Sequence, residues 1–143
     1  GGCIIHLGSE SYHMTFPFMP YPLTKRMLES YSRVLRQELS FKGIRVVIVR
    51  PGAVRTRFIS NLSGITYPVA DSKLKDAFEK FSSSASGEVG KMIPPEKVAS
   101  LIFKLSGRKN PKAVYRINNS LQLKLVSVMP FPILEKVIEK RLK

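Results

Sequence analysis

The chain has 143 residues, of which 43% are hydrophobic and 24% charged, a balance typical of a globular domain rather than of wholesale disorder. Its single cysteine, Cys3, excludes a disulfide framework and a zinc site built from several thiolates. No run of residues reaches the ~18 apolar positions that a membrane-spanning helix needs.

The chain is strongly basic, with a formal net charge of +14. Twelve Lys/Arg and three Asp/Glu fall from Lys91 onward, so most of the excess lies in the last part of the sequence. Such a charge is compatible with a nucleic acid, an anionic membrane or an anionic ligand, and equally with a solvated basic surface. Zinc-finger spacing, a glycine–aromatic RNA-binding signature and a leucine zipper are all absent from the sequence, so we expect no specific nucleic-acid partner.

The first half of the sequence predicts a strand–helix–strand unit. Cys3–Leu7 is a short apolar run bounded by glycines, typical of a buried strand. Residues 8–19 read as a loop, and residues 20–41 have helical periodicity that ends at Gly43. Ile44–Val49 is nearly continuous and β-branched, which is typical of a parallel strand covered on both faces.

The helix over residues 20–41 is predicted to be amphipathic. One stripe is apolar and the other side carries charges: Arg26, Glu29, Arg33 and Arg36. Pro22 suits the first turn, because the missing N–H is not needed there.

The second half of the sequence predicts one more strand and several helices. They are a helix over 71–81, a Ser/Gly-rich loop over 82–90, a helix from Pro95 to about Leu105, a strand over 113–117, and two short helices over 121–129 and 131–142. Three strands with two apolar faces leave an open sheet edge, so we expect further parallel strands upstream or from a partner. The abrupt start at Gly1-Gly2 also leads us to expect a missing upstream part, and the absence of a targeting segment therefore carries no weight.

Tyr21 and Lys25 form the first chemical constellation. Their i, i+4 spacing places both side chains on one face at the start of the predicted helix. The helix dipole and the nearby ammonium both favour loss of the phenolic proton, so Tyr21 is a candidate general acid or base. Ser9 follows the first strand, and Pro51–Thr56 follows the second. Both segments are expected at the carboxyl edge of the sheet, where ligands bind in open α/β folds.

With these motifs in order, the sequence resembles the C-terminal half of the short-chain dehydrogenase/reductase family. The resemblance rests on GCIIHLGS, YPLTK and LRQELSFKGIRVVIVRPGAVRT, and it runs from residue 2 to about residue 58. It implies an α/β, Rossmann-like doubly wound parallel sheet of which residues 1–143 form the C-terminal half of one domain, with the N-terminal strands missing.

The resemblance also implies roles for individual residues. Ser9 matches the serine that orients the substrate carbonyl, Tyr21 the tyrosine that transfers the proton, and Lys25 the lysine that assists it and holds the nicotinamide ribose. Cofactor-binding roles are implied for Tyr21, Lys25, Pro51, Gly52, Val54 and Thr56. Substrate contacts are expected from Ser9, Ser11, His13 and Phe16, and no metal is implied.

Two departures from the family pattern bear on these expectations. The strand ends in His6-Leu7-Gly8-Ser9 instead of the usual Asn-Ile-Ser-Ser, and the interval from Ser9 to Tyr21 is one residue short, so Ser11 is the alternative substrate serine. The glycine-rich phosphate turn, the Asn-Asn-Ala-Gly motif and the catalytic asparagine are also absent. NAD(P) is therefore implied without a choice between NAD and NADP.

The end of the sequence is more loosely similar to hydroxysteroid and retinol dehydrogenase-like members. This similarity implies a small hydrophobic alcohol or carbonyl substrate of steroid, retinoid or acyl type, a substrate lid over residues 57–93 and a helical tail over 119–143. A homodimer through the 20–41 helix is implied. Peripheral membrane contact of the basic C-terminal helix is an alternative to packing on the body, and the localisation is expected to be cytoplasmic or peripheral to a membrane.

The function that follows is NAD(P)-dependent oxidation or reduction between an alcohol and a ketone or aldehyde, with Ser-Tyr-Lys acid–base catalysis. Two alternatives remain open. One is an inactive fragment or pseudo-enzyme that acts as an interaction module, and the other is a basic module that binds anionic surfaces.

Overall fold

The computed structural model describes residues 1–14, 20–57, 75–76, 91–119 and 121–142. Its elements are β1 (Cys3–Leu7), the short 3₁₀ helix η1 (Glu10–His13), α1 (Pro20–Ser40), β2 (Arg45–Pro51), α4 (Pro95–Ser106), β3 (Val114–Ile117), α5 (Leu121–Val128) and α6 (Phe131–Leu142). The predicted strands and helices within these ranges are confirmed to within two residues at each end.

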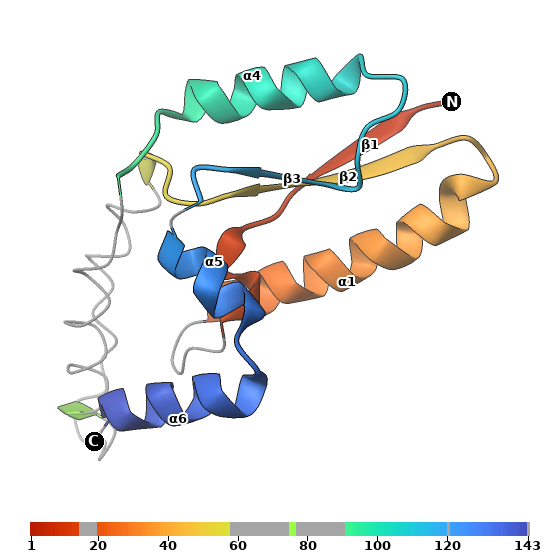
Figure 1. Ribbon diagram of the computed structural model, residues 1–143. Helices are drawn as coiled ribbons and strands as arrows, with labels where there is room; N and C mark the ends of the chain where they lie inside the picture. Colours follow the sequence, from red (N-terminus) through yellow and green to blue (C-terminus); the bar gives the residue numbers. More distant parts are fainter. Residues whose placement is uncertain (15–19, 58–74, 77–90, 120, 143) are drawn as a thin grey trace.

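A parallel three-stranded sheet forms the centre of the fold, in the order β1-β2-β3. Helix α4 covers one face and α1 the other (Figure 1). Because β2 is the middle strand and is covered on both faces, Val46 to Arg50 are all buried. This arrangement is an α/β, Rossmann-like sheet, as the sequence predicts.

The face beneath α4 holds the apolar core. Val47 and Val49 of β2 pack with Val98 and Leu105 of α4. Cys3, expected to be buried, is only half-buried at the margin of this cluster. The reason is its place on β1, which pairs with β2 alone in the described part of the chain.

The face beneath α1 differs from the sequence expectation. Glu29, expected among the exposed charges, is buried, and so is Ser32. Each has a polar partner on the sheet: Glu29 binds Arg50, and Ser32 Oγ is hydrogen-bonded to Nδ1 of His6 at 2.6 Å. Since these polar groups satisfy one another across the interface, they occupy the sheet-facing side of α1.

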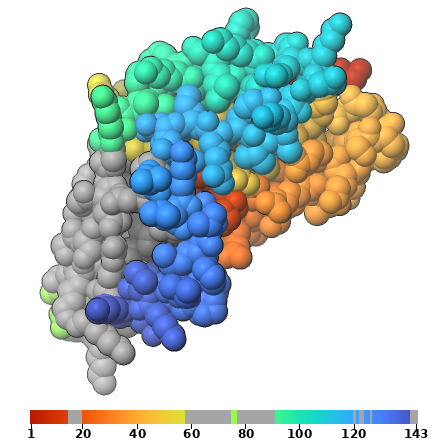
Figure 2. All heavy atoms as spheres, viewed as in Figure 1, coloured from red at the N-terminus to blue at the C-terminus, as the bar shows by residue number. Residues whose placement is uncertain are grey.

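The apolar stripe of α1 consequently faces away from the sheet. Four of its members are between 51% and 64% exposed: Leu23, Met27, Tyr31 and Val34. Leu35 and Leu39, also part of the predicted stripe, are half-buried. In Figure 2, α1 (orange) lies at the surface along the side opposite α4.

The segment after β1 is also more ordered than the predicted loop, because Ser9 caps the one-turn helix η1. Helices α5 and α6 lie beyond the carboxyl ends of the strands, and α5 packs against η1 (Figure 1). The lid expected over residues 57–93 and the helix expected over 71–81 fall almost entirely outside the described residues. No helix in the described ranges is long and apolar enough to cross a membrane.

Candidate active site

The side chains that follow β1 form a small hydroxyl group at the carboxyl edge of the sheet. Ser9 is the N-cap of η1, and its Oγ accepts a hydrogen bond from the backbone N–H of Ser11 at 3.2 Å. The two serine hydroxyl oxygens lie 2.8 Å apart, within hydrogen-bond distance. Ser9 and its alternative, Ser11, are therefore neighbours in a single hydroxyl pair.

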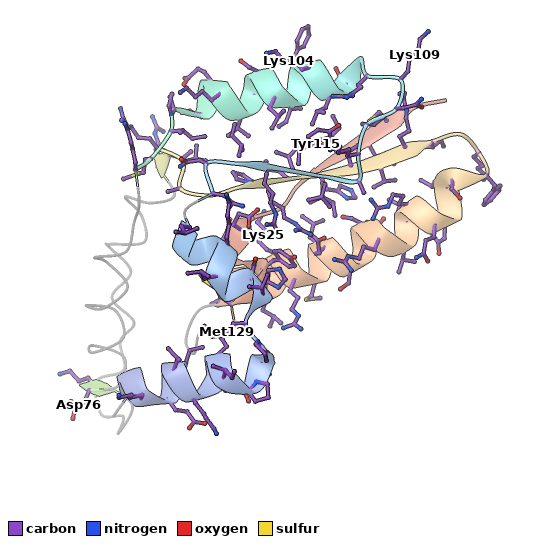
Figure 3. All side chains as sticks on the ribbon, in the orientation of Figure 1. Lys25, Asp76, Lys104, Lys109, Tyr115 and Met129 are labelled. Carbon is purple, nitrogen blue, oxygen red and sulfur yellow. The ribbon has the colours of Figure 1, made fainter. Side chains whose placement is uncertain are left out.

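Helix α1 brings Tyr21 and Lys25 to the same edge. The Nζ of Lys25 lies 5.5 Å from the centroid of the Tyr21 ring. It also donates a hydrogen bond of 2.9 Å to the carbonyl oxygen of Leu7, two residues before Ser9. Figure 3 shows Lys25 at this junction between the first turns of α1 and the end of β1. Partial burial lowers the pKa of the Lys25 ammonium from its ordinary value.

The segment after β2 completes the edge. Pro51 ends the strand, and the N–H of Gly52 donates to the carbonyl of Ile117 in β3 at 2.9 Å. A Cβ on Gly52 would lie 2.1 Å from the backbone oxygen of Asn118, so the close approach of the chain after β3 requires glycine here. Val54 packs at the margin of the core beneath α4. Thr56 is exposed.

Of the remaining candidates, His13 is the last residue of η1. The His13 ring lies 3.6 Å, centroid to centroid, from the ring of Tyr12. Burial, followed by the nearby positive charge of Arg50, lowers the pKa of His13. Phe16 is outside the described residues. The structure thus brings Ser9, Ser11, Tyr21 and Lys25 to one sheet edge.

A hollow of about 510 Å³ lies at the opposite end of the sheet, around the start of β2. Its lining includes Arg36, Arg45 and Lys109 and none of the candidate catalytic, cofactor-binding or substrate-binding residues. The chemistry-bearing groups at the carboxyl edge are therefore the better candidate for the active site.

Comparisons with known proteins show what the whole chain is similar to. No family model matches the chain. The chain is 31% identical over 148 residues to the uncharacterized oxidoreductase YusZ of Bacillus subtilis, covering 99% of this chain and 53% of that protein. It is 29% identical over 146 residues to an NADPH-dependent 3-dehydrocapnine reductase of Ornithobacterium rhinotracheale, covering 99% of this chain and 51% of that protein. It is 30% identical over 106 residues to rat retinol dehydrogenase 16, covering 74% of this chain and 30% of that protein.

Solved structures share the fold. A short-chain dehydrogenase from Streptomyces avermitilis matches 98% of this chain and 49% of its own length, with a TM-score of 0.59 and 22% identity. A short-chain dehydrogenase from Mycobacterium paratuberculosis bound to NAD matches 82% of this chain and 43% of its own length, with a TM-score of 0.53 and 22% identity. The curated oxidoreductases and the solved short-chain dehydrogenases together support the resemblance to the short-chain dehydrogenase/reductase family. The chain spans about half the length of YusZ, of the 3-dehydrocapnine reductase and of the Streptomyces avermitilis structure.

Sequence reasoning missed a group of buried charges in this chain. Glu29 and Arg50 are 5% and 4% exposed and bind each other, and Glu10 is 2% exposed with the Nε of Arg116 3.4 Å from its Oε1. Burial raises the pKa of Glu10, against the opposing positive charge of Arg116. The sequence did indicate that Arg50 is unusual. It is the only charged residue between Val46 and Pro51, in a strand whose pattern predicts cover on both faces.

Proposed function

We propose that this chain carries the catalytic residues of an NAD(P)-dependent oxidoreductase that interconverts an alcohol and a ketone or aldehyde. One observation supports the proposal above all: the Lys25 ammonium lies beside the Tyr21 ring and is hydrogen-bonded to the carbonyl of Leu7, two residues before the Ser9–Ser11 hydroxyl pair. A phenol, a cation and a hydroxyl donor at one sheet edge are the groups that proton transfer to a carbonyl oxygen requires.

The donor set also fits the nicotinamide half of the cofactor. The ammonium of Lys25 can donate to ribose hydroxyls, and the exposed hydroxyl of Thr56 can donate to a carboxamide or a phosphate. One relative is named as NADPH-dependent and one structural neighbour is bound to NAD, so NAD(P) is the cofactor we propose, with the choice between the two left open. Pro51, Gly52 and Val54 are proposed to form the wall beside it.

In the proposed mechanism the chain transfers the proton but not the hydride. When bound, a nicotinamide would supply hydride chemistry at the carbonyl carbon, in either direction. Tyr21 gives its phenolic proton to the carbonyl oxygen, or takes the proton of the alcohol in reverse. Lys25 stabilises the phenolate that remains, by its charge. Ser9, or Ser11 through the shared hydrogen bond, donates to the substrate oxygen and fixes its position.

The substrate we propose is a small hydrophobic alcohol or carbonyl compound of steroid, retinoid or acyl type. The support is the relative named retinol dehydrogenase 16. His13 and Phe16 are proposed as substrate contacts from the loop after β1, and residues 57–93 as the lid.

Two surfaces favour further partners. The exposed apolar stripe of α1, which runs from Leu23 to Val34, supports a homodimer through this helix. On α6, Ile133 and Val137 are exposed beside Lys136 and Lys140, which supports peripheral contact with an anionic membrane. Leu134 and Ile138 are buried, so α6 is at the same time packed on the molecule. Retention of the protein on phosphatidylserine vesicles, but not on neutral ones, is the expected result if α6 binds a membrane.

Titration of the protein with NADH and NADPH, followed by the change in nicotinamide fluorescence, tests the proposal directly. Saturable binding of at least one of them is expected, and a Lys25→Met variant is expected to bind more weakly and to shift the pH profile of turnover to more alkaline values. Lys42→Met, which removes an exposed ammonium after the end of the same helix, is the matched control. Absence of binding to both dinucleotides would instead favour an interaction module, and steeply salt-dependent binding to nucleic acid or acidic vesicles alone would favour the anionic-surface module.

A further inference from the structure

The guanidinium of Arg50 joins the parts of the candidate site. Arg50 directly precedes Pro51 at the carboxyl end of β2 and is 4% exposed. Its Nε donates to Oε2 of Glu29 at 3.1 Å, and its Nη2 donates to Oε1 of the same carboxylate. Two parallel hydrogen bonds between a guanidinium and a carboxylate fix the relative orientation of the groups that carry them. The contact therefore fixes α1, which carries Glu29, against the end of β2.

The same guanidinium holds the turn that follows β1. Its Cζ lies 4.1 Å from the centroid of the Tyr12 ring, and Tyr12 is 7% exposed. Tyr12 belongs to η1, whose N-cap is Ser9, and its backbone N–H donates to the carbonyl of Ser9 at 3.3 Å. A cation over a buried aromatic face is worth more than an exposed one, because water does not compete. Arg50 thus contacts the turn that presents the serine hydroxyls.

Position along α1 links this contact to the proposed catalytic pair. Tyr21, Lys25 and Glu29 are spaced four residues apart and share the side of the helix that faces the sheet. Fixing Glu29 therefore fixes where Lys25 meets the carbonyl of Leu7.

A contribution to stability alone does not account for such a pair. Burying two charges is expensive, and replacing a buried ion pair by well-packed apolar residues is often neutral or stabilising. What the pair provides, and an apolar contact does not, is a single geometry between strand, helix and turn.

We propose that Arg50 is a positioning residue that, through Glu29 and Tyr12, holds α1 and the Ser9 turn at the end of β2 so that Ser9, Tyr21 and Lys25 converge. The catalytic purpose of this arrangement rests on the proposed function, whereas the geometric coupling does not.

A double variant, Arg50→Met with Glu29→Met, tests the proposal without leaving one buried charge unpaired. Arg33→Met is the matched control, because Arg33 is the exposed second partner of Glu29, with its Nε 3.5 Å from Oε1. Hydrogen exchange measured by NMR is the first readout. In the double variant the amides of Tyr12 and Met14, which close the η1 turn, are expected to exchange about tenfold faster or more. The amide of Ile48 in β2 is expected to keep its wild-type rate.

The second readout is the NMR titration of the Lys25 side chain. If α1 loosens at this edge, Lys25 becomes more exposed and its lowered pKa rises toward the ordinary value of 10.5. An Arg50→Lys variant keeps the positive charge but not the two-pronged contact. A rise in the pKa of Lys25 in that variant as well assigns the effect to geometry rather than to the loss of a neighbouring charge.

Unchanged exchange at Tyr12 and Met14 in the double variant would overturn the proposal. Acceleration spread evenly over all amides, Ile48 included, would also overturn it, because that pattern is a loss of overall stability. Neither readout requires a dinucleotide or turnover. A protein that binds no dinucleotide would thus refute the proposed function while leaving this test intact.

Discussion

The ammonium of Lys25 lies 5.5 Å from the centroid of the Tyr21 ring, one turn further along α1. Its hydrogen bond to the carbonyl of Leu7 anchors it to the end of β1. A lysine held in this way cannot turn fully to solvent, so its charge stays near the phenol. The same position partly buries the ammonium, and this burial lowers the pKa of Lys25.

Replacement of Glu10 by glutamine is expected to stabilise the protein increasingly as pH rises. Burial raises the pKa of Glu10 above its ordinary 4.5, so the folded chain holds this proton more tightly than the unfolded chain does. The stability that Glu10 contributes is therefore fully present below pH 4.5 and is lost as pH rises through the raised folded pKa. Urea unfolding of wild type and Glu10→Gln at several pH values measures the difference. Glu38→Gln, at an exposed position of α1, is the control, and a difference that does not change with pH would contradict the account.

Placing a charge in the exposed stripe of α1 is expected to dissociate a dimer. In Met27→Glu the carboxylate would enter the centre of the proposed apolar interface, where desolvation penalises it. Sedimentation equilibrium is expected to give a dimer for wild type and at least a tenfold weaker association for the variant. Phe103→Glu, at an 82% exposed position on α4, is expected to leave the dimer intact. A monomeric wild type would refute the proposed interface.

Gly52→Ala is expected to destabilise the fold by about 1–3 kcal/mol, because the new Cβ would lie 2.1 Å from the backbone oxygen of Asn118. The strain would act at the end of β2, next to Pro51. Gly107→Ala, after α4, is the comparison, since no atom lies within 4 Å of the corresponding Cβ. Thermal unfolding measures both variants. Equal midpoints for the two would mean that the chain after β3 moves away from Gly52 without resistance.

The sequence was a good guide where one pattern had one structural meaning. Glycine-bounded, β-branched runs predicted β1 and β2, and the spacing of Tyr21 and Lys25 placed both on one helical face.

The sequence misled where packing depends on a distant partner. Helical periodicity identifies the apolar stripe of α1 but not which side meets the sheet. Here Arg50, 21 residues further along the sequence, binds Glu29, so a polar part of α1 packs against the sheet. Likewise, nothing local indicates that Glu10 is buried, because its neighbour Arg116 comes from β3. Ion pairs between residues this far apart in sequence can be identified only from the three-dimensional structure.

Turnover of a Tyr21→Phe variant tests the central claim most directly. The substitution removes only the phenolic hydroxyl, so the fold is expected to be unchanged, as circular dichroism would verify. Carbonyl-dependent oxidation of the reduced dinucleotide is expected to fall by about 10²–10⁴, the range that a general acid contributes, while dinucleotide binding is retained. Tyr115→Phe, which removes a hydroxyl bound to the backbone N–H of Lys112 before β3, is expected to keep wild-type activity. A Tyr21→Phe variant that turns over within about twofold of wild type would contradict the account.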